Sequence, residues 1–389
     1  MACSAVAAIS IFVRIGASRI TESVKMLADY NAHETIDVDD KSAPLSNWKQ
    51  RAVECFDAQG KPNYLDSNGQ LKDGIYLNMP NDLYHSLPAL SSSGLKKFSK
   101  SPAHYFREYL SDICDKRTAT QRKSFDAGSY SHELVLEPEG FYDRYFREVM
   151  ESDYPRAIKT AEELRIALSE RGLKTTGTKD VLANRLKEAD PSAEILDVIV
   201  AENRNRQGVA TQQTIDGVME TLYGGKLEIR GDIWEKAHRA EKTVRRHPQA
   251  NTMFSNGLPE ITFIARCPDT GLMLKCKFDW LRFDDDAVDL KTSQSAEPSE
   301  FNRFIRTYRY DLQESFYTYV ASLLGVYLRD FIFVAVEFEQ ADICQPFRLT
   351  EKRKSYAKRD FDQLIQQFKK CKEEDYWPGY YENTVIELD

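Results

Sequence analysis

Residues 272–292 constrain the fold more than any other part of the chain. From 272 to 280 the even positions are apolar and several odd positions are charged, an alternation typical of a half-buried β-strand. Three consecutive aspartates at 284–286 have the composition of a turn. Residues 287–292 then predict a second strand that runs back along the first. The stretch therefore predicts an antiparallel β-hairpin.

The predicted register of this hairpin brings three charged side chains together. A turn at the three aspartates would pair Asp279 with Lys291 and Leu281 with Asp289. Directly paired residues share a face of the sheet, and so do residues two apart on one strand. We therefore expect Asp279, Asp289 and Lys291 on one face. The apolar residues expected beneath them are Phe278, Trp280, Val288 and Leu290.

Two carboxylates and an ammonium on one sheet face are suited to metal-dependent phosphodiester hydrolysis. Hard divalent cations such as Mg²⁺ prefer oxygen ligands. A bound cation polarises the phosphate and lowers the pKa of a water molecule, while a lysine can orient that water. The alternative is a surface ladder of ion pairs, because the D-x-K pattern alone is very common.

Composition indicates an ordinary globular protein. The chain has 389 residues, a formal net charge of −8 and 42% hydrophobic residues, so nucleic acid could be bound only through local basic patches. Its seven cysteines include no C-x2-C pair, so we expect reduced thiols, a cytoplasmic location and no iron–sulfur cluster. No segment approaches the roughly 20 apolar residues that span a bilayer. The short apolar run 5–13 favours a frayed or mis-assigned start, with Met26 as an alternative initiator, over a signal peptide.

Two helices and a third containing a histidine are expected before residue 140. Three serines at 91–93 can cap a helix over about 92–99, and Pro102 separates it from a second helix over 102–112. Lysines in this segment, Lys96 among them, are expected on a solvated face. Residues 125–138 predict a helix that carries His132, and Gly128 in it suggests a close backbone approach. A single histidine is more often structural than a ligand.

Residues 156–190 are expected to form a small inserted module. Two short helices are indicated, with Gly172 ending the first and Thr178 capping the second. From Arg156 to Lys187 there are eight Lys and Arg residues against four Asp and Glu. The pattern resembles the SAP motif, a DNA-binding helical hairpin, at Leu164, Leu168, Gly172, Leu173, Gly177, Lys179, Leu182, Arg185 and Leu186. Lys174, Lys179 and Arg185 would then meet DNA phosphates; the alternative is a hairpin that only packs on its host.

The remaining chain alternates helices and strands. Residues 193–244 are read as mostly helical, with a linker at 202–213. A strand is expected at 260–267, opening with Glu260, and another at 331–337. Between them, residues 308–324 predict a helix on which Gln313 and Tyr317 share a face. A final amphipathic helix is expected at 356–372. The arginines that can meet phosphate before the 308–324 helix are Arg303, Arg306 and Arg309.

The order of these motifs resembles the PD-(D/E)xK nuclease superfamily, and more narrowly its RecE-type exonuclease VIII group, which is related to the RecB nuclease domain. The similar stretches are SSSGLKKFSKSPAHYF, GSYSHELVLEPEGF, CKFDWL, VDLKTS and YRYDLQESFY. The resemblance implies an α/β fold with a restriction-endonuclease-like αβββαβ core. The nuclease domain would comprise residues 76–155 and 191–389, the SAP-like hairpin residues 156–190, and residues 1–75 an N-terminal extension.

The resemblance also implies roles for individual residues. Asp279, Asp289 and His132 would hold Mg²⁺ or Mn²⁺, and Lys291 would activate the attacking water. Gln313 and Tyr317 match the Q-x3-Y motif that contacts DNA near the cut. Glu260 is a further candidate for a metal ligand, or lies outside the metal site because of its offset from the hairpin. Phe278 stands where the family often has a proline before the first aspartate. That proline takes no part in the chemistry, so its replacement leaves the expected activity unchanged.

The implied function is a metal-dependent exonuclease acting on double-stranded DNA ends, 5′ to 3′, in phage or prophage recombination. The resemblance further implies a RecT-like single-strand annealing partner and a homo-oligomeric ring, with no membrane involved. Two alternatives are an endonuclease or Cas4-like nuclease of the same superfamily, and a non-catalytic DNA-binding scaffold with a degenerate core.

Overall fold

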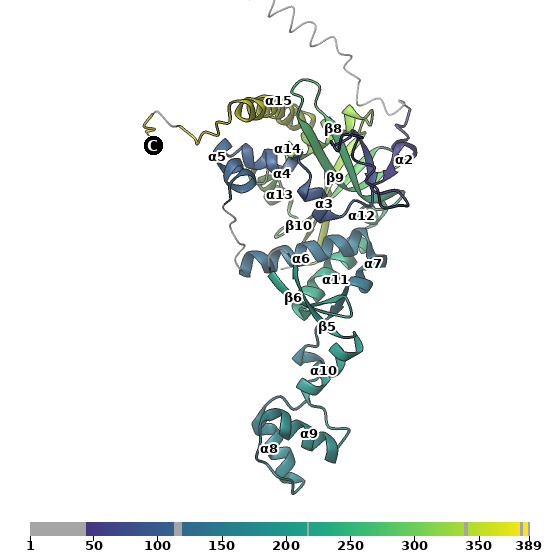
Figure 1. Cartoon of the computed structure of the whole chain (residues 1–389), viewed down its shortest axis with the longest axis vertical. Helices are drawn as coiled ribbons and strands as arrows, with labels where there is room; N and C mark the ends of the chain where they lie inside the picture. The colour runs from purple at the N-terminus through teal and green to yellow at the C-terminus, as the bar shows by residue number, and fades with distance from the viewer. Residues whose placement is uncertain (1–43, 113–118, 216–217, 338–340, 382–383, 388–389) are drawn as a thin grey trace, which may run out of the picture.

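The structure is a computed structural model that describes residues 44–112, 119–215, 218–337, 341–381 and 384–387 (Figure 1). The predictions for the apolar run 5–13, Met26, Cys3 and Cys114 lie outside these residues. Within them, all five cysteines are free and buried. No helix in the described part of the chain is long and apolar enough to cross a bilayer.

An eight-stranded mixed sheet forms the centre of the molecule, with strand order β1-β2-β8-β9-β10-β11-β12 and β3 paired to β9. The strands are β1 (Val53–Glu54), β2 (Gly74–Leu77), β3 (Leu90–Ser91), β8 (Gly257–Arg266), β9 (Met273–Arg282), β10 (Asp286–Ser293), β11 (Asp330–Glu337) and β12 (Ile343–Phe347). β8, β9 and β10 form an antiparallel meander, and β11 lies parallel to β10. Residues 53–77 thus contribute to the sheet, and β2 crosses the predicted boundary at residue 75.

Helices cover both faces of this sheet. One face packs against α4 (Ser92–Phe98), α13 (Pro298–Thr307), α14 (Tyr310–Leu323) and α15 (Glu351–Glu374), and the other against α6 (Ala119–Leu136), α11 (Gly231–Arg246) and α12 (Pro248–Met253). α13 and α14 connect the parallel strands β10 and β11, as a crossover must. The order α6, β8, β9, β10, α14, β11 is the expected αβββαβ core, so the fold prediction is confirmed.

The β9–β10 register differs from the prediction. Leu281 pairs with Ala287 and Trp280 with Val288, so each β9 residue faces a β10 residue two positions earlier than expected. Asp285 adopts a left-handed φ of 66°. Its carboxylate accepts hydrogen bonds from the backbone N–H and the Oγ–H of Ser46. The turn is therefore held by a residue that is distant in sequence. Because the shift is by two residues, each side chain stays on the face of the sheet that was predicted for it.

The apolar packing under the hairpin also differs from the prediction. Val288 and Leu290 lie in the cluster beneath α11, with Trp280 packed against it. Phe278 packs in the cluster on the opposite face, edge-on to Tyr317 at a centroid distance of 5.1 Å. The two β-strands therefore do not present one continuous apolar face.

A second, four-stranded sheet and a helical hairpin extend from this core. The second sheet has the order β4-β7-β6-β5, formed by β4 (Tyr145–Arg147), β5 (Ala210–Ile215), β6 (Val218–Tyr223) and β7 (Lys226–Ile229). The predicted linker at 202–213 is wrong, because α10 (Leu196–Arg206) and β5 occupy it. The hairpin of α8 (Ala161–Glu170) and α9 (Lys179–Ala189) lies at the end of the molecule far from the main sheet (Figure 1).

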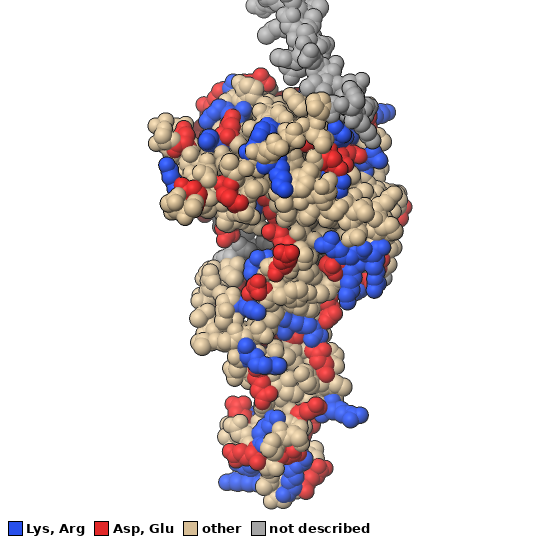
Figure 2. Space-filling view, turned by 90° about the vertical axis from the view of Figure 1, so that its right-hand side faces the viewer, with Lys and Arg blue, Asp and Glu red and all other residues tan. Residues whose placement is uncertain are grey.

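The remaining helices are short. They are α2 (Trp48–Arg51), α3 (Asn81–Ser86), α5 (Pro102–Tyr105), α7 (Pro138–Arg144), a π-helical turn (Phe106–Leu110) and a 3-10 turn (Glu151–Asp153). Figure 2 shows acidic and basic side chains interspersed over one face, with one group of basic side chains at mid-height. This distribution agrees with the absence of a global basic field from an acidic chain.

Candidate active site

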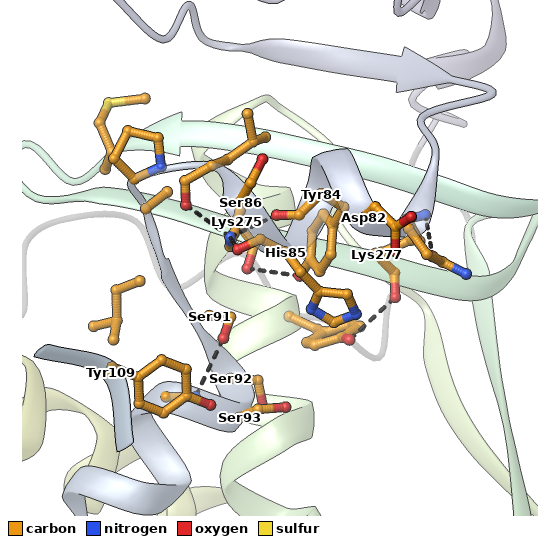
Figure 3. Close-up of a pocket in the computed structure, with 18 of the residues that line it drawn as sticks. Asp82, Tyr84, His85, Ser86, Ser91, Ser92, Ser93, Tyr109, Lys275 and Lys277 are labelled. Carbon is orange, nitrogen blue, oxygen red and sulfur yellow. Dashed lines mark hydrogen bonds between the residues drawn. The ribbon is translucent and has the colours of Figure 1, made fainter. Parts of the chain in front are cut away.

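Strand β9 carries two buried lysines in front of Asp279. Lys275 donates hydrogen bonds to the backbone carbonyls of Tyr84 and Leu87, at 2.6 and 2.8 Å. Lys277 donates to the carbonyl of Met79 at 2.8 Å. Both side chains are therefore covered by the α3 segment rather than exposed on a half-buried strand (Figure 3). They hold that segment in place as one wall of a cavity of about 1700 Å³, which Asp279 and Glu260 also line.

Strands β9 and β10 separate where the acidic side chains lie. Ladder pairing is confined to Leu281–Ala287 and Trp280–Val288. Beyond it, the backbone N–H of Leu290 donates to Asp279 Oδ2 at 2.8 Å. The Asp279 carboxylate thus accepts the hydrogen bond that, in a regular ladder, the Leu290 N–H would donate to a backbone carbonyl of the neighbouring strand. On β10, the Lys291 ammonium forms an ion pair with Asp289 Oδ2. Asp279, Asp289 and Lys291 converge, because the two-residue shift in register keeps them on the same face of the sheet.

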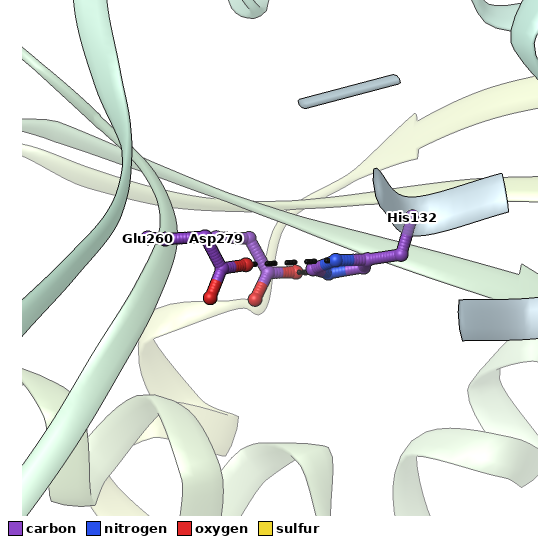
Figure 4. Close-up of side chains that lie close together, drawn as sticks. All are labelled: His132, Glu260 and Asp279. Atoms are coloured by element: carbon purple, nitrogen blue, oxygen red, sulfur yellow. Dashed lines mark ion pairs between the residues drawn. The ribbon is translucent and has the colours of Figure 1, made fainter. Parts of the chain in front are cut away.

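His132 and Glu260 join Asp279 from two other elements (Figure 4). His132 Nε2 of α6 lies 2.7 Å from Asp279 Oδ2, and its Nδ1 lies 3.6 Å from Glu260 Oε1. Glu260 of β8 has a φ of 53°, a left-handed conformation that is costly for a residue with a Cβ. This backbone turn interrupts the alternation of β8 and places the carboxylate beside His132. Of the two positions expected for Glu260, the structure has the one within the site.

Gly128 allows α6 to approach β10. A Cβ at this position would lie 3.0 Å from Thr292 Oγ1, so a larger residue would press against Thr292 of β10. His132 is one helical turn further along α6 and shares its face. The close approach suggested by the sequence is therefore present, and it sets the depth at which the imidazole reaches the carboxylates.

Helix α14 supplies polar contacts from the other side of the sheet. Gln313 Nε2 donates to Asp289 Oδ1. Its Oε1 accepts from the Lys96 ammonium at 3.2 Å. The Tyr317 hydroxyl donates to the backbone carbonyl of Lys277 at 3.1 Å. Gln313 therefore touches an acid of the site, whereas Tyr317 braces the strand that carries one. Sequence reasoning missed Lys96, because a lysine in a basic helix is usually solvated.

The ionisation of these groups reflects their burial and proximity. Burial raises the pKa of Asp289 to about 6, although Lys291 opposes the shift. Burial also raises the pKa of Glu260. Burial alone would lower the pKa of His132, but Asp279 and the other carboxylates outweigh it and raise that pKa to about 9. The pKa of Asp279 is lowered by His132 against the effect of burial. The site is thus an acidic cluster that attracts positive charge.

The donor set fits a small divalent cation. His132, Glu260 and Asp279 each offer a ligand atom within 4.8 Å of the other two. Asp289 is buried beside them, with its Oδ2 against the Lys291 ammonium. Oxygen donors with one imidazole suit Mg²⁺ or Mn²⁺. His132, Glu260 and Asp279 would hold such an ion with Asp289 beside them. The sequence had suggested His132, Asp279 and Asp289, with Glu260 as a further candidate.

The arginine expected to contact DNA near α14 has partners within the protein. Arg309 Nη2 lies 2.8 Å from Asp360 Oδ2 of α15, and its Nε lies 3.2 Å from Asp311 Oδ1. Its guanidinium therefore joins the start of α14 to α15. A phosphate contact would have to compete with these two carboxylates.

The basic residues of the α8–α9 hairpin lie far from the acidic cluster (Figure 1). Arg185 donates to the backbone carbonyls of Lys174 and Thr176, at 2.6 and 3.1 Å, and Lys179 forms an ion pair with Asp197. Lys174 is exposed. The hairpin has its own apolar core of Leu164, Leu168, Leu182, Ala183, Leu186 and Ile195. It packs on itself rather than on the main sheet, and DNA binding by it stays a prediction.

Comparisons with known proteins identify a family for the chain. The crystal structure of a candidate exonuclease from Eubacterium rectale aligns with a TM-score of 0.45 and 13% identity, over 80% of this chain and 96% of that one. The crystal structure of the protein SSO0001 aligns with a TM-score of 0.21 and 10% identity, over 64% and 87%. No curated protein matches the sequence. The family model described as a PDDEXK-like domain of unknown function, DUF3799, matches residues 91–386. The chain belongs to this PDDEXK-like family.

Proposed function

We propose that this protein is a metal-dependent exodeoxyribonuclease that hydrolyses phosphodiester bonds from the ends of duplex DNA. The observation that carries the proposal is the meeting of His132, Glu260 and Asp279 around one point, with Asp289 and Lys291 on the adjacent strand. Membership of a PDDEXK-like family supports a nuclease. The action on ends, the 5′ to 3′ direction and the recombination role rest on the resemblance of its motifs to RecE-type exonucleases.

The residues of the chain divide the chemical work. A divalent cation held by His132, Glu260 and Asp279 would polarise the phosphate and make water more acidic. Lys291 lies against Asp289, where its ammonium can orient the attacking water and offset charge that develops on the phosphate. Gln313 fixes Asp289 through its amide. The ladder between the two strands stops short of this point, and Glu260 and Asp279 line the cavity.

The proposed setting is a bacterial cytoplasm. Single-stranded tails left by such an enzyme would be the substrate of a RecT-like annealing protein, and a homo-oligomeric ring would keep the enzyme on one strand. Both partners come from the resemblance and are tested by co-purification and by light scattering of the purified chain. Neither is needed for the chemistry of the site.

The first experiment is digestion of linear duplex DNA labelled at the 5′ or the 3′ end, in Mg²⁺ or EDTA, beside a closed circular duplex. We expect Mg²⁺-dependent loss of the linear DNA, early release of the 5′ label and an intact circle. A nicked circle would indicate an endonuclease or Cas4-like nuclease. Retained DNA binding with no cleavage in Mg²⁺ or Mn²⁺ would indicate a non-catalytic scaffold.

A pair of variants tests the site itself. Asp279→Ala should abolish cleavage and keep DNA binding, because it removes a ligand from the acidic cluster. Asp284→Asn is the matched control, since Asp284 lies in the hairpin turn and pairs with Arg282 outside the site. Cleavage by Asp279→Ala at the rate of the unmodified protein would refute the assignment.

A further inference from the structure

The ammonium of Lys96 lies at the edge of the candidate site without a carboxylate of its own. Among the described residues, its one hydrogen-bond acceptor is Gln313 Oε1, at 3.2 Å. The side chain is only partly exposed, and an ammonium has three donors to satisfy. Two of them find no acceptor in the part of the chain that the structure describes. A partly buried ammonium with unsatisfied donors is costly unless an anion accepts hydrogen bonds from them.

The nearby carboxylates are engaged elsewhere. Asp289 is bound by Lys291 and by the Gln313 amide. Asp311 is bound by Arg309 and Arg353, at 3.2 and 3.1 Å. Neither forms an ion pair with Lys96. Both attract its charge without touching it, so a phosphate would supply the direct contact that these carboxylates do not.

Lys96 and Lys291 flank the same two side chains. Lys291 contacts Asp289 directly, and Lys96 reaches it through Gln313. Both ammonium groups lie over the ring of Tyr310, at 4.9 Å for Lys291 and 5.6 Å for Lys96. Burial and the repulsion of Lys291 lower the pKa of Lys96 to about 8, although Asp289 and Asp311 oppose the shift. Two neighbouring cations that repel each other form a favourable place for a bound anion.

We propose that Lys96 is a second phosphate-binding lysine of this site, which contacts a phosphate group of the DNA strand beside the bond that is cut. This inference rests on the proposed function, since the anion is the phosphate that a nuclease substrate brings. Gln313 then has two tasks, because one amide holds Asp289 with its N–H and Lys96 with its oxygen. The phosphate is either an internal phosphodiester of the strand or the terminal phosphate at its end.

The test is the salt dependence of DNA binding. Affinity is measured for a short duplex in Ca²⁺, with the DNA shown to remain intact, at several concentrations of KCl. Lys96→Met should weaken binding about tenfold at low salt and make the slope of log affinity against log salt shallower by about one. Lys96→Arg should restore the slope, because it keeps the charge. A purely structural role would not change the slope.

Lys97→Met is the matched control. Lys97 is the next residue of α4, and its ammonium pairs with Glu108 rather than with the site. It should bind DNA with the slope of the unmodified protein. Equal slopes for Lys96→Met and the unmodified protein would overturn the proposed role of Lys96 and leave the proposed nuclease function untouched. A chain with no affinity for DNA would overturn the proposed function as well.

Duplexes with a 5′-phosphate or a 5′-hydroxyl distinguish the two sources of phosphate. A loss in Lys96→Met that occurs with both duplexes supports contact with an internal phosphodiester. A loss confined to the phosphorylated duplex supports contact with the terminal phosphate. Either result agrees with Lys96 as a phosphate ligand, and equal binding of both duplexes by Lys96→Met and the unmodified protein contradicts it.

Discussion

Glu314 of α14 is a buried acid outside the candidate site, and it should make stability depend on pH. Its Oε1 lies 3.7 Å from Lys354 Nζ, and its Oε2 has no hydrogen-bond partner among the described residues. Burial raises the pKa of Glu314 from its usual 4.5 to about 8, and Lys354 compensates only in part. The folded protein therefore holds this proton where the unfolded chain has lost it. The free energy of unfolding should fall as pH rises between these two values.

Glu314→Gln should remove this contribution. Urea unfolding of the unmodified protein at pH 5 to 8 should show a loss of about 1 kcal/mol or more that the variant lacks, since one pKa unit corresponds to about 1.4 kcal/mol. Glu351→Gln is the control, because Glu351 pairs with the same lysine at 3.0 Å but is exposed. It should keep the pH dependence of the unmodified protein. Parallel curves for the Glu314 variant and the unmodified protein would contradict the prediction.

Individual site residues differ in how well the sequence predicted their positions. Asp279, Asp289 and Lys291 converge even though the register is shifted by two, because such a shift preserves facing. The position of Glu260 depends on a left-handed backbone angle that no local pattern encodes. Lys96 meets Gln313 only through the packing of α4 on α14. The chemistry of β9 and β10 was therefore predictable, and the contacts between distant elements were not.

At the scale of elements, the approach of α6 to β10 should control metal binding. Gly128→Ala would place a methyl group 3.0 Å from Thr292 Oγ1, so the Thr292 side chain or α6 has to give. We expect α6 to shift and to carry His132 away from Asp279. We expect Mn²⁺ affinity, measured by calorimetry, to fall several-fold. Thr292→Ala in the same chain removes the opposing oxygen and should recover much of the loss. Equal affinity of Gly128→Ala and the unmodified protein would show that α6 accommodates the methyl group.

The α8–α9 hairpin should be removable as a unit. Its two ends meet at Ile158 and Ile195, where the N–H of Leu196 donates to the Ile158 carbonyl at 3.0 Å. Because the hairpin has its own core, replacing residues 159–194 with a short Gly-Ser linker should leave the thermal midpoint of the remainder nearly unchanged. If the hairpin binds phosphates, DNA affinity and its salt dependence should both fall. An unchanged salt slope would favour a hairpin without a role in DNA binding.

The elements that the sequence predicted well are those with strong periodicity. β9, β10, β11 and α14 have clear apolar patterns, and the structure contains each of them. The second sheet was missed because β5 is almost entirely exposed and β6 is half-exposed, so neither shows the alternation of a strand with one buried face. Two-residue strands such as β1 are too short for any pattern. Their places are set by pairing with distant parts of the chain.

The whole molecule should be stabilised by the metal ion that its site is suited to bind. Three half-buried ligands from α6, β8 and β9 meet at this point, so an ion held there would tie together elements that are distant in sequence. A ligand that binds only the folded state adds about 2.7 kcal/mol at a hundred times its Kd. We therefore expect saturating Mn²⁺ to raise the thermal midpoint by about 2–5 °C.

Glu260→Gln should lose most of this increase, because it removes one of the three mutually close ligands. Asp284→Asn should keep it, since Asp284 lies in the turn beside Arg282. An equal increase in all three proteins would place the ion elsewhere, and no increase in the unmodified protein would argue against a metal centre at His132, Glu260 and Asp279.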